Sequence, residues 1–487
     1  MPRRGEAVVS GVRSCAAQRG ATLAHKGRRT ESKPAVTEGL LVPELNPAAS
    51  SKLEAVWRRA MNGRGKPPKP GWGVRFVAGV LAAAAPSPAA ADPAPAGAAA
   101  ASAAAEMGER AALAAAVTTT AQLLEAVAAA RPGEAILIAP GIYRTIVRFG
   151  PGNSGTADAP VVLGARDGLG TVVIDGDGAN ITLKLSGAAY VEIRDLEITG
   201  GGYHGVFLDR GAHHVTIRHN RIYDNHRIRP MDSHAEIKGS GGEGRPSDIA
   251  IVDNEIFHRS HPPGGNFQGI DCNFCDRFRI EGNHLHDINS PTGQPYSHYD
   301  RGACIQMKSG STGTIIARNR IARCHIGIVY GGEGLASPEH QGGIVESNLI
   351  HDSAEMAIAI VNVRDGQVYH NTLFNNGESI RIAPDRRHPS SLNEADVANN
   401  ILDHPLTRPG GLSPAPRSNY VLAAARARAP FVDAGRRDFR LRPSALAVID
   451  RGSDLGADAA RDYEGTPRPQ GRARDIGAFE HQPELSR

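Results

Sequence analysis

An eight-residue pattern, apolar-x-apolar-x-x-Asn-x-apolar, recurs through the middle of this 487-residue chain. It is written "VTIRHNRI", "IAIVDNEI", "FRIEGNHL", "TIIARNRI", "GIVESNLI" and "GQVYHNTL", with small variations at the first position. The Asn positions are Asn220, Asn254, Asn283, Asn319, Asn348, Asn371 and Asn400. A unit of this length cannot bury its apolar side alone, so repeated units stack and share a core. The pattern therefore predicts a solenoid.

Two solenoids carry such a pattern, and the residues around it separate them. A leucine-rich repeat needs a further Leu eight residues before each Asn. The residues found there are Ala212, Pro246, Cys275, Ser311 and His340. Ile and Val outnumber Leu in the repeats, and the unit length varies, which favours an all-β, right-handed parallel β-helix. In that fold the Asn lies in a sharp bend, where its side chain bonds nearby backbone and the Asn of the next coil.

The start of the repeat region predicts a cap for this helix. Thr119 and Gln122 form a capping-box pattern, which opens a short helix running to Ala130, with Leu123 and Val127 on one face. A solenoid must cover the open end of its core. We therefore expect a short N-terminal capping helix.

The segment ahead of the repeats has the composition of an export signal. The basic residues Arg64, Lys66, Lys69 and Arg75 precede an apolar run, Phe76 to Ala85, that is too short to span a membrane. Ala89-Ala90-Ala91 then supplies a cleavage site, so the pattern predicts a signal peptide and a secreted or periplasmic protein. The predicted division is 1–60, an extension from an early start codon or a disordered tail; 61–91, the signal peptide; 92–118, an Ala/Pro-rich linker; 119–405, the β-helix; and 406–487, a segment that caps or packs on it.

The charge balance limits the classes of binding partner, and the cysteine content limits the possible cross-links. Lys and Arg number 55 against 51 Asp and Glu, which argues against nucleic acid as the main partner, and we expect a monomer without a membrane span. Four Cys lie in the predicted mature chain: Cys272, Cys275, Cys304 and Cys324. Export permits disulfides, and four Cys allow three pairings. A zinc ligand pair and small residues that fill the core are the alternatives.

Several segments resemble a known superfamily. "AQLLEAVAAARPGEAILIAPGIYR", "SGTADAPVVLGA" and "VVIDGDGANITLKLSGAAYVEIRDLEI" resemble the opening coils of the pectate-lyase-like β-helix superfamily. "RDYEGTPRPQGRARDIGAFE" resembles the C-terminal segment of exported bacterial β-helix proteins. The resemblance covers about residues 119–481. It implies the fold and leaves the reaction open.

A second strand precedes each Asn strand, and its outward residues carry the chemistry. We aligned "HGVFLDRG", "HAEIKGSG", "QGIDCNFC" and "ACIQMKSG" on Val206, Ala235, Ile270 and Ile305 as inward residues. With adjacent coils about 4.8 Å apart, one outward patch then contains Asp209, Glu236, Lys238, Asp271, Asn273, Gln306 and Lys308. Glu236 beside Asp271 is unfavourable without a cation, so Asp209, Glu236 and Asp271 are predicted Ca²⁺ ligands. A solvated polar face is the alternative.

This patch suits β-elimination at a uronate. Ca²⁺ would neutralise the sugar carboxylate, and a neutral Lys would remove the adjacent proton. Lys308 is the predicted base, and Lys238 would lower its pKa. The predicted substrate-binding residues are Asn273, Gln306, His298 and Arg301. An acidic polysaccharide is the predicted partner.

Two local resemblances concern the reaction. "RGACIQMKSGSTGTIIARN" resembles the coil of alginate lyases and chondroitinase B that holds their catalytic Lys, which implies Lys308. Those enzymes place two Glu shortly before that Lys and an Arg in the next coil, whereas this chain has "GAC" and Tyr330. "DSHAEIKG" resembles the Asp/His site of mannuronan C5-epimerases, which implies Asp232 and His234.

Three functions therefore stay open. A polysaccharide lyase would release unsaturated uronate products. A C5-epimerase or glycoside hydrolase of the same fold would give products without the new double bond. A non-catalytic glycan-binding protein would bind without turnover. The fold alone does not choose among them.

Overall fold

A computed structural model describes residues 116–227, 233–260, 266–288, 302–332, 336–383, 385, 387–388, 393–407, 414–422 and 430–482. The chain divides into two units, residues 1–92 and 93–487, and every described residue belongs to the second unit. The predicted signal peptide, Asp232, His298 and Arg301 lie outside the described residues.

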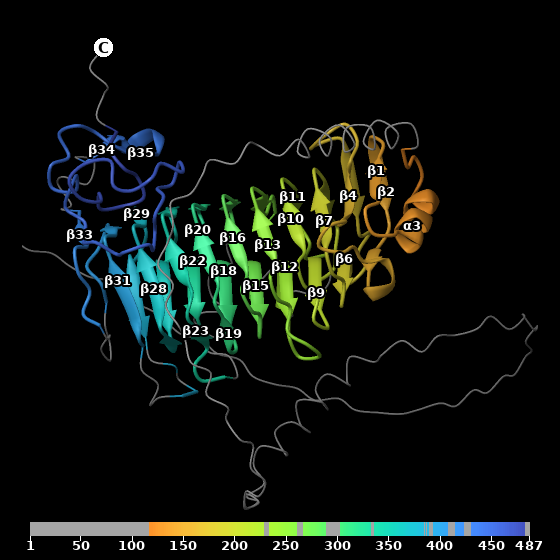
Figure 1. Ribbon diagram of the computed structural model, residues 1–487, viewed down its shortest axis with the longest axis horizontal. Coiled ribbons are helices and arrows are strands. Elements are labelled where there is room, and N and C mark those ends of the chain that lie inside the picture. The colour runs from red at the N-terminus through yellow and green to blue at the C-terminus, as the bar shows by residue number, and fades with distance from the viewer. Residues whose placement is uncertain are drawn as a thin grey trace, which may run out of the picture. The chain divides into compact units, whose positions relative to one another are not determined.

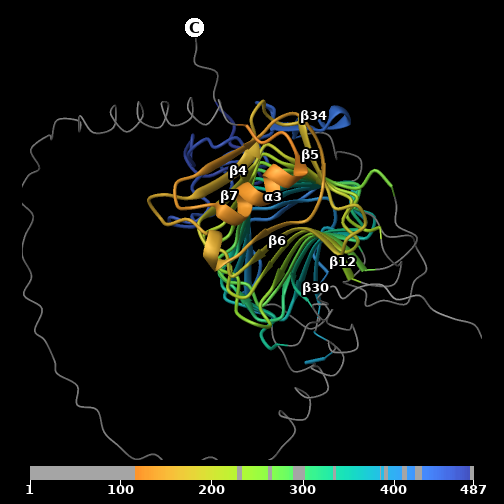
Figure 2. The same cartoon turned by 90° about the vertical axis from the view of Figure 1, so that its right-hand side faces the viewer.

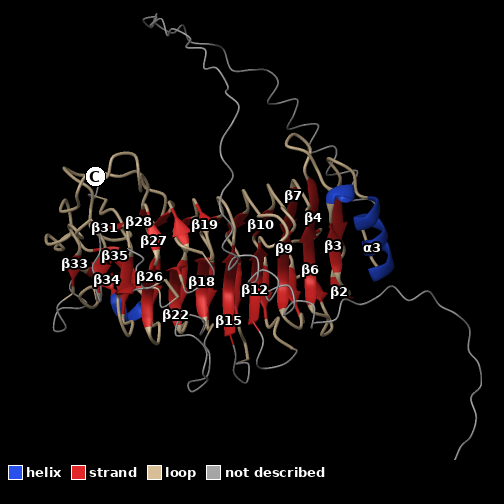
Figure 3. Cartoon of the chain, turned by 90° about the horizontal axis from the view of Figure 1, so that it is seen from below, coloured by secondary structure: helices blue, strands red, loops and turns tan. Residues whose placement is uncertain are grey.

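Three long parallel sheets run side by side along the repeat region, as Figure 1 and Figure 3 show. Sheet A contains β1 (Ala135–Ile138), β4 (Val161–Ala165), β7 (Val191–Arg194), β10 (Thr216–Arg218), β13 (Ala250–Val252), β16 (Arg279–Glu281), β20 (Ile315–Ala317), β24 (Ile344–Glu346), β28 (Gly366–Tyr369) and β31 (Ala395–Ala398). Sheet B contains β2 (Gly141–Arg144), β5 (Val172–Asp175), β8 (Glu197–Thr199), β11 (Arg221–Tyr223), β14 (Glu255–Phe257), β17 (His284–His286), β21 (Arg320–Ala322), β25 (Leu349–His351), β29 (Thr372–Phe374), β32 (Ile401–Leu402) and β33 (Tyr420–Val421). Sheet C contains β3 (Val147–Phe149), β6 (Ile181–Ser186), β9 (His204–Asp209), β12 (Ser233–Ser240), β15 (Asn266–Asn273), β18 (Ala303–Lys308), β22 (Ile326–Gly331), β26 (Met356–Val361) and β30 (Ile380–Ala383).

Shorter elements complete the described fold. A small parallel sheet contains β19 (Ser311–Thr312), β23 (His340–Gln341) and β27 (Val363–Arg364). An antiparallel pair follows the last coil, β34 (Phe431–Asp433) with β35 (Asp438–Leu441). The helices are α3 (Thr120–Ala129) and the 3₁₀ turns η1 (Pro151–Asn153) and η3 (Ala434–Arg436).

Most coils contribute one strand to each of the three sheets, and the inward residues of successive coils stack. Ile193, Ile217, Ile251 and Ile280 pair in register along sheet A and are fully buried. One continuous apolar core results, formed mainly by Ile, Val and Leu from all three sheets. The predicted all-β, right-handed parallel β-helix is confirmed.

The repeated Asn forms a ladder at the corner between sheets A and B. Asn254 Oδ1 accepts hydrogen bonds from the backbone N–H and the side-chain amide of Asn220, both at 3.0 Å. The same pair of bonds links every following Asn and extends the ladder to Asn419. The left-handed residue of each corner is the one before the Asn, for example His219 with φ 53°, and not the Asn itself. The Asn thereby satisfies buried backbone groups while its neighbour makes the bend.

A helix covers the N-terminal end of the described core, and the C-terminal segment packs on the last strands of sheet B. Thr119 and Gln122 form the predicted capping box, with Thr119 Oγ1 accepting from the Gln122 backbone N–H at 3.2 Å. Helix α3 buries Leu123 and Val127 and lies across the first coil (Figure 2). At the other end a separate apolar cluster around Phe431 and Phe439 packs against sheet B.

The four cysteines that the structure describes are buried in the coils. Cys304 and Cys324 form a disulfide, while Cys272 and Cys275 are reduced. No helix in the part of the chain that the structure describes is long and apolar enough for a membrane crossing.

Candidate functional site

The outward face of sheet C carries a group of acid, base and amide side chains over β9, β12, β15 and β18. The strand pairings place Phe207, Lys238, Asp271 and Gln306 in one column across these four coils. A second outward column contains Asp209, Ser240, Asn273 and Lys308. In the next two coils the first column becomes apolar, with Val329 and Ala359. We call the polar part the sheet C face.

The register of β12 differs from the predicted alignment by two residues. Val206 and Ile270 both pair with Ile237, not with Ala235. Lys238 is therefore the residue beside Asp271, and Ser240 takes the place expected for Lys238. A shift of two preserves the in–out alternation of a strand, so the alternation alone did not reveal it.

Glu236 does not reach the outward face. Its carboxylate is 1% exposed and lies at the corner between sheets B and C. There Oε1 accepts from the Asn225 backbone N–H at 3.1 Å, and Oε2 accepts from the Asn225 side-chain amide at 2.5 Å. His258 Nε2 lies 3.1 Å from Oε1. The predicted pair of adjacent carboxylates, Glu236 and Asp271, is therefore not formed.

Lys238 and Asp271 instead form an ion pair across adjacent coils, Nζ to Oδ2. Both are buried, with residue exposures of 8% and 1%. The second oxygen, Asp271 Oδ1, is also buried and accepts no hydrogen bond from the described residues. Placing two charges where little water reaches them costs desolvation free energy that the pair recovers only in part.

His204 is a member of this face that the sequence analysis did not predict. It begins β9, stacks on Phe207 with ring centroids 5.2 Å apart, and pairs in register with Ala235. Burial first, then the positive charges of Lys238 and His234, lower the pKa of His204 to about 3. The imidazole is therefore neutral at ordinary pH. The available signal was its position at the start of a strand, in "YHGVFLDRG".

Lys308 lies at the far end of the face from His204. It pairs in register with Asn273 and is 9% exposed. A Cβ atom at Gly332 would stand 3.3 Å from Lys308 Cβ and 3.4 Å from the Gln306 side-chain amide. Gly332 thus leaves room in the next coil for both side chains.

Aromatic rings border the face on its sheet B side. His234 stacks between Tyr203 and Phe267, with centroid distances of 5.4 Å and 4.8 Å. Flat, partly polar rings are suited to contact with sugar rings. His298 and Arg301, predicted to bind substrate, and Asp232, implied beside His234, lie outside the described residues.

The third predicted calcium ligand, Asp209, is also committed to another partner. Its Oδ2 lies 3.0 Å from Lys184 Nζ. Asp209 therefore pairs with Lys184, Asp271 with Lys238, and Glu236 with Asn225 and His258. Ca²⁺ needs six to eight converging oxygens, and these three carboxylates do not converge. The described residues of this face do not fit a calcium site.

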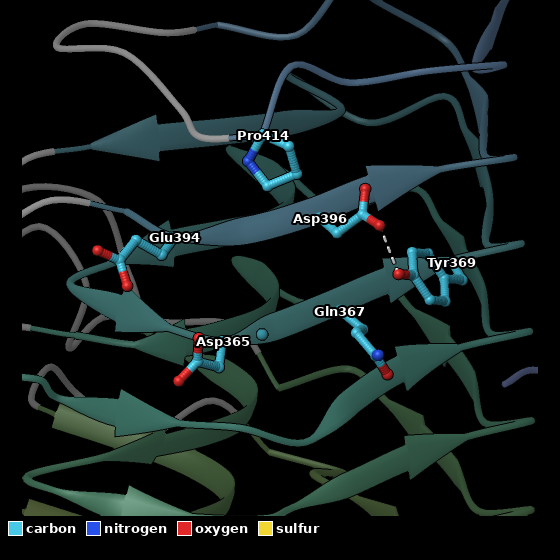
Figure 4. Close-up of a pocket in the computed structure, with 7 residues that line it drawn as sticks. Asp365, Gln367, Tyr369, Glu394, Asp396 and Pro414 are labelled. Atoms are coloured by element: carbon cyan, nitrogen blue, oxygen red, sulfur yellow. Dashed lines mark hydrogen bonds between the residues drawn. The ribbon is translucent and has the colours of Figure 1, made fainter. Parts of the chain in front are cut away.

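A shallow hollow of about 470 Å³ lies elsewhere, on sheet A. Figure 4 shows its lining, with the Tyr369 hydroxyl donating to Asp396 Oδ2 at 2.6 Å. Asp396 also pairs with Arg417. A further lining carboxylate, Glu394 Oε2, lies 3.5 Å from Arg364 Nε. Two of the hollow's carboxylates therefore already pair with arginines, and the sheet C face, with its buried pair, is the better candidate site.

Comparisons with known proteins support the fold, but the family match does not include the strands that carry Lys238, Asp271 and Lys308. The chondroitinase B family model matches residues 117–223, which form the opening coils and end before Lys238. The crystal structure of pectate lyase Pel9A is similar over 74% of this chain and 90% of that chain, with 15% identity and a TM-score of 0.50. An alginate lyase from Paenibacillus sp. str. FPU-7 is similar over 63% of this chain and 97% of its own, with 18% identity and a TM-score of 0.37. A comparison with curated protein sequences found no match.

Proposed function

We propose that this chain is an exported polysaccharide lyase that cleaves a uronate-containing polysaccharide by β-elimination on the sheet C face. The observation that carries the proposal is the buried Lys238–Asp271 pair, which stands one coil from Lys308 on an outward surface. The chondroitinase B match and the fold shared with a pectate lyase support the same class of reaction.

A buried ion pair on an outward face is poorly explained by stability. Replacing such a pair by apolar residues is often neutral or stabilising, and beyond Gln306 the same column is in fact apolar, with Val329 and Ala359. Charged groups held in a desolvated place by a specific partner mark candidate functional sites. The pair therefore supports a site at β12 and β15.

Lys238 is the proposed partner of the sugar carboxylate. Asp271 holds its ammonium group in place from the adjacent coil, and the ammonium keeps further hydrogens to donate. Charge on the sugar carboxylate opposes removal of the neighbouring proton, because a carbanion would form beside an anion. A cation at this position offsets that charge in the transition state.

Lys308 is the proposed base. Its neutral amine takes the proton from the carbon that bears the carboxylate. The electron pair of that C–H bond forms the new C=C bond, and the bond to the neighbouring glycosidic oxygen breaks. The ammonium of Lys308 then returns a proton to the leaving oxygen, so protons and electrons balance. Because the amine must be neutral to act, the rate should rise with pH.

Neutral groups complete the proposed site. His204 is uncharged at ordinary pH and offers a ring nitrogen to a sugar hydroxyl. Gln306 and Asn273 lie beside Asp271 and Lys308 in the two outward columns, and their amides suit sugar hydroxyls as well. Calcium has no part in this proposal, because the carboxylates predicted to bind it have other partners.

The proposal is tested by incubating the purified mature protein with alginate, pectate, chondroitin sulfate and hyaluronan, and measuring ultraviolet absorbance and product mass. β-Elimination creates a C=C bond next to the carboxylate, so its products absorb ultraviolet light. Because no water is added, these products are lighter by one water than those of hydrolysis. We expect absorbing products from one of these polymers, with or without chelator. Cleavage without absorbance would establish a hydrolase. Inverted uronate without chain cleavage would establish an epimerase, and binding without turnover a glycan-binding protein.

A further inference from the structure

A second group of side chains lies at the corner between sheets B and C, one aromatic ring away from the sheet C face. His226 follows β11, Glu236 lies in β12 of the same coil, and His258 follows β14 in the next coil. One ligand-type atom from each lies within 4.8 Å of the others. Glu236 and His258 are buried, with exposures of 1% and 5%.

From this arrangement we propose a binding site for a transition-metal ion, with Zn²⁺ as the best fit, formed by His226, Glu236 and His258. Two imidazoles and one carboxylate are a typical zinc donor set, with bonds of about 2.0–2.2 Å. Calcium prefers an all-oxygen shell, so this site differs in its metal from the one predicted for Glu236 in the sequence.

A further observation points to a missing ligand. The Nδ1 atom of His226 is buried and has no hydrogen-bond partner among the described residues, whereas its Nε2 lies 3.4 Å from Ser260 Oγ. Buried polar atoms without partners are costly, and a metal ion would remove part of that cost.

Glu236 is already oriented for this role. Asn225 donates to both of its carboxylate oxygens, which fixes the carboxylate while each oxygen keeps lone-pair capacity. Hydrogen bonds of this kind position metal ligands in many sites. His258 Nε2 lies 3.1 Å from Oε1, close to the separation of about 3.4 Å between two ligands of one tetrahedral zinc at the bond lengths above.

A comparable group elsewhere in the chain shows why this one is preferred. Glu255, His284 and His286 also come within reach of one another. There, however, Glu255 pairs with Arg221 at 2.9 Å, and His286 pairs with Asp287 at 2.6 Å. Those ligand atoms already have charged partners near solvent, whereas no Arg or Lys pairs with Glu236 among the described residues.

The proposed ion would join two coils behind the aromatic border of the sheet C face. Phe267 packs edge-on against both histidines, with centroid distances of 5.9 Å to His226 and 6.2 Å to His258. Its other contact is the stack with His234. A fixed position for the two histidine rings therefore supports the wall of rings beside the proposed lyase site, although metal binding does not depend on lyase activity.

The test is to load the mature protein with Zn²⁺, dialyse it against metal-free buffer and measure zinc per chain, melting temperature and, after Co²⁺ loading, the visible spectrum. We expect one retained zinc, a higher melting temperature, and the intense absorption of four-coordinate Co²⁺. His226→Gln should bind at least tenfold more weakly and lose the zinc-dependent rise in melting temperature. Because Glu236→Gln also disturbs Asn225 and could impair folding, His226→Gln is the deciding variant.

His284→Gln is the matched control, since it removes one histidine from the comparable group on sheet B. We expect it to retain zinc like the unaltered protein. The proposal is overturned if the unaltered protein retains no zinc, if His226→Gln retains it as tightly, or if the zinc is lost in His284→Gln instead.

Discussion

Two lysine–carboxylate pairs stand on the outward face of sheet C, and they differ mainly in their surroundings. Lys184 and Lys238 occupy the same column two coils apart, with Phe207 between them. The Lys184–Asp209 pair has side-chain exposures of 28% and 14%, and Lys184 also lies over the Phe207 ring. The Lys238–Asp271 pair has exposures of 10% and 1%. The same two residue types therefore form one half-buried pair, with Lys184 within reach of solvent, and one buried pair.

The difference separates an ordinary surface contact from a candidate site. A pair whose lysine is reached by solvent contributes about 0–1 kcal/mol to folding, so Lys184 and Asp209 need no function to explain them. A buried pair gains little net stability but is costly to break. Side chains that the fold retains at such a cost are better explained by what they bind, and here they lie beside Lys308.

The largest expected effect on stability comes from removing one partner of the buried pair. Lys238→Met leaves the Asp271 carboxylate buried without its cation, which should lower the free energy of unfolding by about 3–5 kcal/mol. The matched change Lys184→Met should cost about 0–1 kcal/mol. Urea denaturation of both variants, followed by circular dichroism, measures the two values.

The double variant Lys238→Met with Asp271→Leu is the control for this prediction. It removes both charges and should recover most of the lost stability. Equal losses of unfolding free energy for Lys238→Met and Lys184→Met would show that the two pairs have the same environment in solution. The two pairs would then not differ in burial as described.

A smaller loss is expected from a scaffold residue that is far from both pairs. Asn319→Ala removes the hydrogen bonds that the Asn319 side chain makes to Asn283, to Asn348 and to the backbone. Buried groups left unpaired cost about 1–3 kcal/mol. Thermal melts should show this loss, while activity per folded molecule stays unchanged. An unaltered melting temperature would contradict the structural role of the ladder.

The ladder and the sheet C face also show what the sequence could predict. The same Asn is used at each A–B corner from Asn220 to Asn400, so it repeats, and repetition is visible in a sequence. The residues of β12 do not repeat, and their register depended on choosing between Ala235 and Ile237 as the counterpart of Val206. The larger Ile237 was the better match to Val206, Ile270 and Ile305 by size, and that signal was available.

The partners of individual side chains were less predictable. Glu236 turns to the corner because Asn225 and His258 meet it there, and those residues come from other strands. The pairing of Lys238 with Asp271 follows from a two-residue change in register. Contacts between coils depend on loop lengths that the repeat pattern leaves free.

The smallest expected effect is a change in pH dependence. The pKa of His204 is near 3 in the folded protein and about 6.5 in an unfolded chain. Between these values the unfolded state binds more protons, so stability falls as pH decreases from about 6.5 towards 3. His204→Gln should make that decline shallower than it is in the unaltered protein. Melting temperatures of the two proteins at pH 7, 5.5 and 4 measure the decline, and identical slopes would contradict a neutral His204.

We propose Lys308, which lies beside the buried pair, as the base of a β-elimination. The most direct measurement is the rate of formation of unsaturated product by Lys308→Ala and Lys184→Ala on the polysaccharide that the unaltered protein cleaves. A positioned base contributes about 10²–10⁴ in rate, so Lys308→Ala should lose at least about a hundredfold while oligosaccharide binding persists. Lys184→Ala should keep nearly the full rate. Full activity in Lys308→Ala, or equal losses in both variants, would contradict the account.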